Sequence, residues 1–231
     1  GYPTFELELP STGKTIKYRP FLVKEEKVLL MALESKDEKQ VVSAVKDLIK
    51  NCVITRIKVD NLPSFDLEYL FLKIRGASIG ENIILTVTCL DDNETQVEAN
   101  ININDVEIFK PEGHDKKIMF DENTGLVMKY PSMKEFVDRE FLQKEMKTED
   151  VYEFIADSID QIFDSEEVYD SSTTTKKEFR TFVDSLTTKQ FEKIQKFYET
   201  SPKLSHTFKV TNPKTGKESS YTIEGLQSFF A

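Results

Sequence analysis

The chain has 231 residues, of which 39% are apolar and 31% are charged, and its formal net charge is −10. With 17 Phe residues it can build a core for one large domain or two small ones. Residues 134–170 hold 13 Asp and Glu against four Lys and Arg. Such an acidic segment repels phosphate groups, so no specific nucleic-acid binding is expected. It fits a solvated helix surface or a surface for a basic protein partner.

The positions of the Cys residues and the hydropathy of the chain indicate the compartment in which the protein is expected. Cys52 and Cys89 each lie in an apolar run. We therefore expect buried free thiols rather than a disulfide framework, which fits a reducing cytoplasm. The sequence shows no signal peptide and no apolar run near 18 residues, so no membrane insertion is expected.

The first expected element is a β-hairpin. Apolar and polar residues alternate over residues 5–9 and 15–21, and Ser11-Thr-Gly-Lys14 between them is typical of a turn. Gly13-Lys14-Thr15 is similar to the end of a phosphate-binding loop. That motif needs Gly where this chain has Glu8, and it joins a strand to a helix. We therefore expect no nucleotide site here.

Three helices are expected next. Apolar spacing predicts one over residues 24–33. Ser35 and Glu38 form a capping box, which predicts a second helix to about Asn51, and a third is expected after Pro63. The apolar positions of these helices are Val28, Leu29, Met31, Ala32, Val41, Val42, Val45, Leu48, Ile49, Leu67, Leu70, Phe71 and Ile74.

The middle of the chain predicts β-structure. Residues 83–89 and 97–103 alternate in polarity on either side of a turn at Asp91–Glu94. This pattern is typical of an antiparallel hairpin with one solvated face. Two further strands are expected around residues 117–120 and 126–130.

After Pro131 the pattern becomes helical. Three capping boxes precede apolar periodic runs, and they are Ser132 with Glu135, Thr175 with Glu178, and Thr187 with Gln190. The side chains expected in the core of this part are Phe179, Phe182, Val183, Leu186, Phe191, Ile194, Phe197 and Tyr198. Asp164–Asp170 is acidic but lacks the Gly of a calcium-binding loop, so it is interpreted as a solvated helix end.

The stretch from His206 onward is the most distinctive part of the sequence. It predicts two strands around a turn at Pro213–Gly216, followed by an apolar tail. Asn212-Pro-Lys-Thr215-Gly has the shape of a zinc knuckle without its two Cys residues, and Asn and Thr do not replace thiolate ligands. No metal is therefore expected, and an ordinary polar hairpin explains the same pattern.

Together these elements predict an α+β fold, because strands and helices are segregated. It comprises an N-terminal hairpin, a helical segment, a central antiparallel sheet, a C-terminal helical region and a terminal zinc-ribbon-like hairpin without metal. The expected domains are a mixed α+β domain over 1–131, a helical region over 132–203, and a hairpin with an apolar tail over 204–231. His114 and His206 belong to no recognisable catalytic pattern. No catalytic residue and no cofactor are expected, although an enzyme with a site built from distant carboxylates stays open.

Several segments together carry a family pattern. They are Arg19-Pro-Phe-Leu-Val, Ile159-Asp-Gln-Ile-Phe, Glu178-Phe-Arg-Thr-Phe, Lys189-Gln-Phe-Glu-Lys and Glu224-Gly-Leu-Gln-Ser-Phe-Phe. In them the chain resembles the baseplate hub protein family of T-even-type contractile-tailed bacteriophages. Some members carry a Cys-x-x-Cys knuckle in the terminal hairpin, and this chain departs from it at Asn212 and Thr215.

The resemblance implies a non-enzymatic protein that acts in the hub of the phage baseplate through contacts with other hub proteins. It is compatible with an oligomer of this chain. It also implies the host cytoplasm during assembly and the virion tail baseplate as locations. Two roles stay open. The protein is either a hub subunit that remains in the virion or a transient assembly chaperone that is absent from the mature virion. Leu226, Phe229 and Phe230 are the candidate partner-binding residues. They anchor a partner or pack on their own domain.

Overall fold

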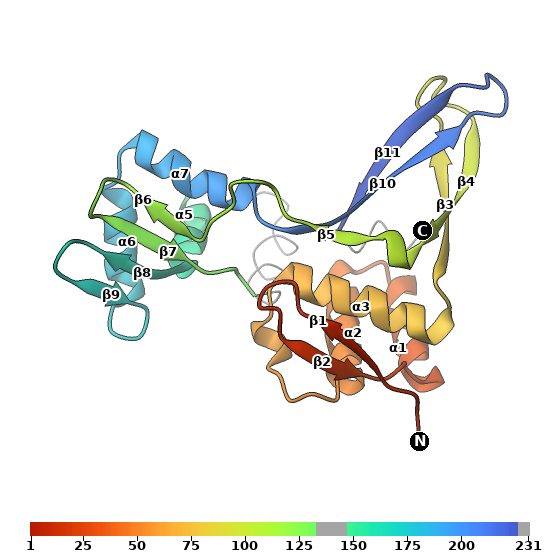
Figure 1. Cartoon of the computed structure of the whole chain (residues 1–231), viewed down its shortest axis with the longest axis horizontal. Helices are drawn as coiled ribbons and strands as arrows, with labels where there is room; N and C mark the ends of the chain where they lie inside the picture. The colour runs from red at the N-terminus through yellow and green to blue at the C-terminus, as the bar shows by residue number, and fades with distance from the viewer. Residues whose placement is uncertain (133–146, 226–231) are drawn as a thin grey trace. The chain divides into compact units, whose positions relative to one another are not determined.

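The computed structural model describes residues 1–132 and 147–225, and its α+β fold confirms the class expected from the sequence (Figure 1). The chain divides into two compact units. Unit 1 combines Gly1–Phe109 with Pro202–Ala231, and unit 2 is Lys110–Ser201. All strand pairs among the described residues are antiparallel. The parallel, doubly wound alternative is therefore excluded for this part of the chain.

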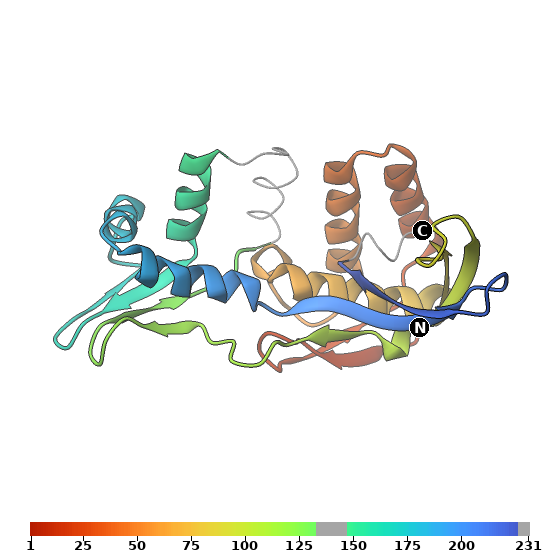
Figure 2. The same ribbon diagram turned by 90° about the horizontal axis from the view of Figure 1, so that it is seen from above.

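Unit 1 begins with a hairpin and three helices. Strand β1 (Phe5–Glu8) pairs with β2 (Thr15–Tyr18), and the helices are α1 (Val23–Glu34), α2 (Glu38–Cys52) and α3 (Ser64–Ile79), with a 3-10 helix over Val59–Asn61. Helices α1 and α2, red and orange in Figure 2, lie side by side, and α2 also contacts α3.

Helix α3 lies at the centre of this core. Its predicted apolar positions are all fully buried, and they are Leu67, Leu70, Phe71 and Ile74. Asp66 in its first turn is buried as well, and its carboxylate accepts hydrogen bonds from the backbone N–H of Ser11 at 3.0 Å and from the Ser11 hydroxyl. Because a buried carboxylate needs such partners, this contact ties the β1–β2 turn to α3.

The capping box expected at Ser35 is wrong. Ser35 lies at the C-terminal end of α1, where its hydroxyl donates to the Ala32 carbonyl at 2.6 Å. Asp37 is the N-cap of α2, and its carboxylate accepts from the Lys39 N–H at 3.0 Å. Ser and Asp are comparable N-caps. The tight turn between the helices, with Lys36 at a φ of 56°, selects Asp37.

Two sheets complete unit 1. One is the hairpin of β3 (Asn82–Thr88) and β4 (Gln96–Asn102), and the other has the order β11 (Glu218–Glu224), β10 (Lys203–Thr211), β5 (Glu107–Phe109). A 3-10 helix over Ile103–Asp105 follows β4. The predicted inward positions of β3 and β4 share one buried cluster with β10, which includes Ile83, Leu85, Ala99, Ile101, Leu204 and Val210.

Unit 2 is a four-stranded sheet packed with three described helices. The strands, in sheet order, are β6 (Lys117–Met119), β7 (Gly125–Met128), β8 (Ile159–Phe163) and β9 (Val168–Asp170). The helices are α5 (Thr148–Asp157), α6 (Lys176–Asp184) and α7 (Thr188–Glu199). Their common core includes Leu126, Met128, Ile155, Ile159, Phe179, Val183, Ile194 and Phe197.

Two predicted capping boxes of unit 2 are confirmed. The Thr175 hydroxyl accepts from the Glu178 N–H, and the Glu178 carboxylate accepts from the Thr175 N–H. Thr187 and Gln190 form the same reciprocal pair at the start of α7. The third predicted box, Ser132 with Glu135, extends outside the described residues.

The helical region expected over 132–203 is wrong at β8 and β9. Ile159 and Ile162 are both buried although they lie three residues apart, a spacing that is typical of a helix. The register of β8 against β7 shifts between Ile159 and Gln161, and this bulge allows both Ile side chains to face the core. Asp164–Asp170 consequently covers the β8–β9 turn and strand β9 instead of a helix end.

The two units also differ from the three consecutive segments expected from the sequence. Strand β5 pairs with β10, so the polypeptide before unit 2 joins the polypeptide after it. Strand β6 pairs with β7 and β7 pairs with β8, so neither joins the sheets of unit 1. Pairing between distant strands, which no local pattern encodes, therefore sets the boundaries.

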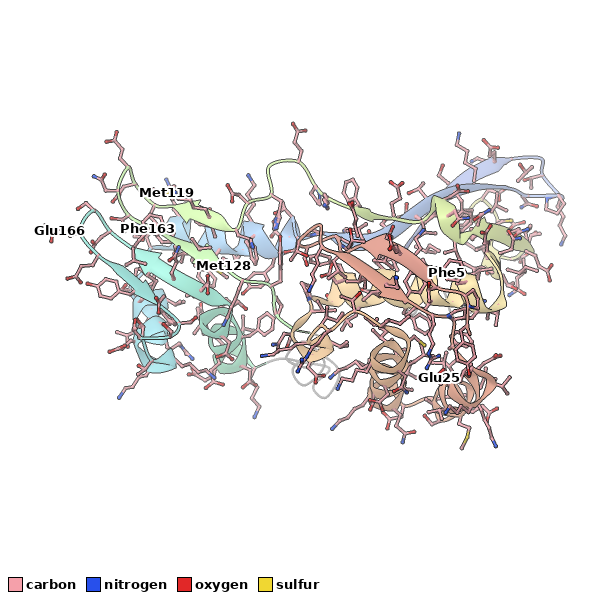
Figure 3. All side chains as sticks on the ribbon, turned by 60° about the horizontal axis from the view of Figure 1, so that its bottom comes forward. Phe5, Glu25, Met119, Met128, Phe163 and Glu166 are labelled. Atoms are coloured by element: carbon pink, nitrogen blue, oxygen red, sulfur yellow. The ribbon has the colours of Figure 1, made fainter. Side chains whose placement is uncertain are left out.

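We expect Gly125→Ala to destabilise unit 2. A Cβ at Gly125 would clash with the carbonyl oxygen of Ile118 and lie 2.8 Å from the ring of Phe163, which is labelled in Figure 3. Because a backbone atom must move, the free energy of unfolding should fall by about 1–3 kcal/mol, measured by urea denaturation.

Gly76→Ala is the matched control. This helical glycine has its nearest neighbour, a methyl group of Ile103, 3.6 Å from the added Cβ, which is an ordinary contact. The same change should therefore raise the free energy of unfolding by about 0.5–1 kcal/mol. A Gly125→Ala protein as stable as the wild type would contradict the described packing of β6, β7 and β8.

Candidate functional site

The predicted site residues do not all lie in the part of the chain that the structure describes. Leu226, Phe229 and Phe230 lie outside the described residues, and so does the acidic segment from 134 to 146. In unit 1, two described features concentrate groups that can make contacts. They are a set of hydrogen bonds between two hairpin turns and an exposed apolar face on α1.

The two hairpin turns have the same backbone pattern. In the β3–β4 turn, the Asn93 N–H donates to the Cys89 carbonyl at 2.8 Å, and Asn93 has a φ of 55°. In the β10–β11 turn, the Gly216 N–H donates to the Asn212 carbonyl at 2.8 Å, and Gly216 has a φ of 73°. The turn predicted at Asn212 therefore has a counterpart at Cys89.

Side chains of these turns hydrogen-bond to each other. The Asn212 amide donates to the carboxylates of Asp91 at 3.0 Å and Asp92 at 2.9 Å, and the Thr215 hydroxyl donates to Asp91 at 2.6 Å. The two turns lie side by side in Figure 1. We call Asp91, Asp92, Asn212 and Thr215 the turn clasp. Asn212 is 1% exposed, so its two amide hydrogens depend on these carboxylates.

The electrostatics of the clasp favour charged carboxylates and a neutral thiol. Hydrogen bonds from Asn212 and then Thr215 lower the pKa of Asp91. The Thr95 hydroxyl is the largest cause that lowers the pKa of Asp92, followed by neighbouring backbone N–H groups. Burial, and then the nearby Asp carboxylates, raise the pKa of Cys89. Cys89 is therefore protonated at neutral pH and is a poor metal ligand.

A zinc knuckle would carry thiolate ligands at positions 212 and 215. In this chain Asn212 and Thr215 stand there and form the hydrogen bonds of the turn clasp. Within residues 1–132 and 147–225, no group of three or more His, Cys, Asp and Glu side chains is placed to hold a metal ion. A metal-free terminal hairpin stays a prediction.

None of the described helices is long and apolar enough to cross a membrane. Both thiols are buried and free, as predicted.

The charged groups in the described part of the acidic segment make contacts within unit 2. Arg180 pairs with Glu149 at 2.6 Å, and Lys176 pairs with Asp157 at 3.2 Å. The carboxylate of Asp164 accepts from two backbone N–H groups of its own turn. These contacts agree with the solvated-surface interpretation better than with one continuous face for a basic partner.

The two His residues lie in different units. His114 forms hydrogen bonds of 2.8 Å with the hydroxyls of Thr200 and Tyr130 and stacks on Phe197, and burial lowers its pKa. His206 stacks on Phe208 in β10. These contacts are those of structural aromatic side chains.

The exposed face of α1 was not expected. Leu29 and Ala32 are buried as predicted, but Val28, Leu30 and Met31 are 55%, 49% and 59% exposed. The apolar spacing at these positions predicted the helix, but Val28 and Met31 do not belong to its buried side. The signal was present in the sequence, because these residues belong to an uninterrupted apolar run that is wider than the buried face of one helix.

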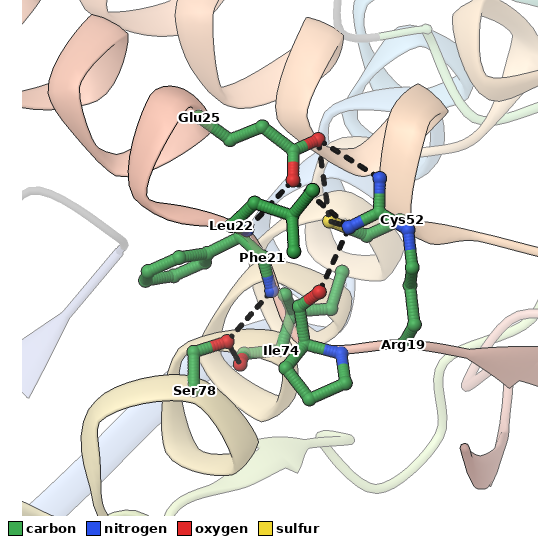
Figure 4. A network of polar contacts seen from close by, with 8 residues as sticks. Arg19, Phe21, Leu22, Glu25, Cys52, Ile74 and Ser78 are labelled. Atoms are coloured by element: carbon green, nitrogen blue, oxygen red, sulfur yellow. Dashed lines mark hydrogen bonds and ion pairs between the residues drawn. The ribbon is translucent and has the colours of Figure 1, made fainter. Parts of the chain in front are cut away.

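An ion pair fixes the start of α1 (Figure 4). The guanidinium of Arg19 donates to both carboxylate oxygens of Glu25, at 2.8 and 3.1 Å, and Glu25 also accepts from the Leu22 N–H at 2.8 Å. The Phe21 N–H donates to the Ser78 hydroxyl of α3 at 2.9 Å. The bidentate pair ties the chain after β2 to the first turn of α1, and the bond of Phe21 ties the segment before α1 to α3.

Comparison with protein families gives a match over almost the whole chain. A model of the T4 bacteriophage base plate protein family matches residues 2–231 of the chain. Neither the curated proteins nor the solved structures gave a match.

We expect Asn212→Ala to weaken the clasp. The variant loses donors to two carboxylates, so the free energy of unfolding at pH 7 should fall by about 1–3 kcal/mol, measured by urea denaturation. Lys214→Ala is the control in the same turn. Its side chain is exposed, and the change should stay within about 0.5 kcal/mol of the wild type. Equal stabilities of the two variants would contradict the clasp.

This destabilisation should depend on pH. Asp91 and Asp92 have folded pKa values below the unfolded value of about 4, so their contribution is present above about pH 4 and is lost as the pH falls through the lowered values. The stability difference between wild type and Asn212→Ala should be constant from about pH 7 to 5 and shrink as the pH is lowered further. A difference that persists unchanged in strong acid would refute this assignment.

Proposed function

Because the chain belongs to the T4 bacteriophage base plate protein family, we propose that this structural baseplate protein acts in the hub. It does so through contacts with other hub proteins and without catalysis. The family match over residues 2–231 is the observation that supports the proposal most, since it covers almost the whole chain. The assignment to the hub rests in addition on a resemblance to the baseplate hub protein family. This resemblance is carried by the segments that begin at Arg19, Ile159, Glu178, Lys189 and Glu224.

The described surface supports a role in protein–protein contacts. Val28, Leu30 and Met31 each expose an apolar side chain on α1, where the Arg19–Glu25 pair holds the helix start in place. Apolar groups on a rigid element are typical of interface anchors. The tail residues Leu226, Phe229 and Phe230 are proposed as further anchors from the sequence alone.

A transient assembly chaperone of the hub is the second candidate, because an exposed apolar face serves a temporary partner equally well. Quantitative mass spectrometry of purified phage tails distinguishes the two roles. We expect the protein in finished tails in a fixed ratio to the other baseplate proteins. Presence in assembly intermediates but absence from finished tails would establish the chaperone instead.

Replacement of both tail rings tests the proposed anchors. We expect Phe229→Ser with Phe230→Ser to weaken hub assembly about tenfold or more, since a buried apolar anchor is commonly worth about 2 kcal/mol. The measurement is hub assembly from purified components. Gln227→Ala with Ser228→Ala is the control in the same segment and should assemble normally.

Stability measurements decide how the double variant is interpreted. The isolated variant should unfold at the same urea concentration as the wild type. A loss of stability would mean that the rings belong to the core of their own domain. A folded variant that assembles normally would show that the tail is not the contact surface.

A further inference from the structure

A pocket in unit 1 is lined by residues of α1, the end of α3 and the start of β3. Its volume is about 260 Å³. Three apolar residues that line it are partly open to solvent, with Leu30 49%, Ile79 51% and Ile84 60% exposed. Phe21 and Leu29 also line it and are buried. The pocket is therefore mostly apolar, and Leu30 of α1 lies on its exposed side.

Arg75 is the unusual group in this lining. Its Nη1 atom is buried and has no hydrogen-bond partner within the described residues. Glu26 also lines the pocket and attracts the guanidinium, but burial has the larger effect and lowers the pKa of Arg75. Arg remains charged at neutral pH even so. A charged group with an unsatisfied donor in an apolar setting is costly unless a partner supplies an acceptor.

We propose that this pocket binds a segment of another baseplate protein in which a carboxylate side chain is flanked by apolar residues. Nη1 of Arg75 is covered in the isolated chain, so a carboxylate can accept hydrogen bonds from this guanidinium once the side chain turns toward it. The flanking apolar side chains would cover Leu30, Ile79 and Ile84, which are partly exposed in the isolated chain. The inference rests on the proposed role in protein–protein contacts and specifies the chemistry of one partner.

The apolar lining disfavours the other occupants. The sugar-phosphate backbone of a nucleic acid offers no apolar side chains to cover Leu30, Ile79 and Ile84. Residues 226–231 of the chain itself contain apolar side chains but no Asp or Glu. That segment therefore offers no carboxylate side chain to Arg75, and an acidic partner segment fits the pocket better.

Two blocked pentapeptides test the proposal. One has a glutamate between leucine and phenylalanine with a glycine at each end, and the other has glutamine in place of the glutamate. Each is titrated into the full-length chain while NMR follows the methyl groups of Leu30, Ile79 and Ile84. We expect the glutamate peptide to bind about tenfold more tightly, as a charge-assisted hydrogen bond requires.

Variants assign this preference to the pocket. Arg75→Gln should abolish the difference between the peptides, whereas Arg56→Gln, which removes an exposed Arg of the same unit, should preserve it. Leu30→Ser on the exposed side of the pocket should weaken both peptides by a similar factor. This second variant keeps the test decisive if Arg75→Gln fails to fold.

Three results would overturn the proposal. The first is equal affinity of the two peptides, and the second is the absence of any shift at the three methyl-bearing residues. The third is binding only to the variant with Phe229→Ser and Phe230→Ser, which would mean that the chain's own tail fills the pocket. None of these results bears on whether the protein is present in finished tails, so the hub role is tested separately.

Discussion

The pairing of β10 with β5 is the contact on which the architecture of unit 1 depends. Lys203, Leu204 and Ser205 pair with the three residues of β5, although the whole of unit 2 separates the two strands in the sequence. Leu204 is fully buried in the same cluster as β3, β4 and Leu72 of α3. The polypeptide that returns from unit 2 thereby completes a core that the first 109 residues leave open. It also brings the β10–β11 turn to the β3–β4 turn, which is the precondition for the turn clasp.

The chemistry of unit 1 fits a protein that makes contacts. The clasp satisfies a buried amide and two carboxylates with one another, and the Arg19–Glu25 pair does the same at the start of α1. Such satisfied networks hold elements in one arrangement. The apolar face of α1 and the pocket with Arg75 are, in contrast, left without partners in the described chain. Hydrogen-bonded networks that fix the backbone, next to exposed apolar side chains, are consistent with membership of a baseplate family.

Local sequence patterns predicted the parts of the fold that local physics determines. The apolar stripe of α3 and the caps at Thr175 and Thr187 follow from spacing and side-chain chemistry within a few residues. Strand β8 was mistaken for helix, because a bulge gives Ile159 and Ile162 a helical spacing. The clasp and the unsatisfied Arg75 could not be predicted, since both depend on which distant segments meet. For the clasp, Asn212 was recognised as unusual, but its partners at Asp91 and Asp92 required the tertiary structure.

We propose that this baseplate family member acts in the hub through apolar surface of unit 1. A cryo-electron microscopy reconstruction of purified tails, at a resolution that shows side chains, tests it most directly. We expect density for the chain in the hub at the tail axis, with Leu30 and Met31 of α1 covered by another subunit. Density at the baseplate periphery, or in the hub with this face of α1 open to solvent, would contradict the account.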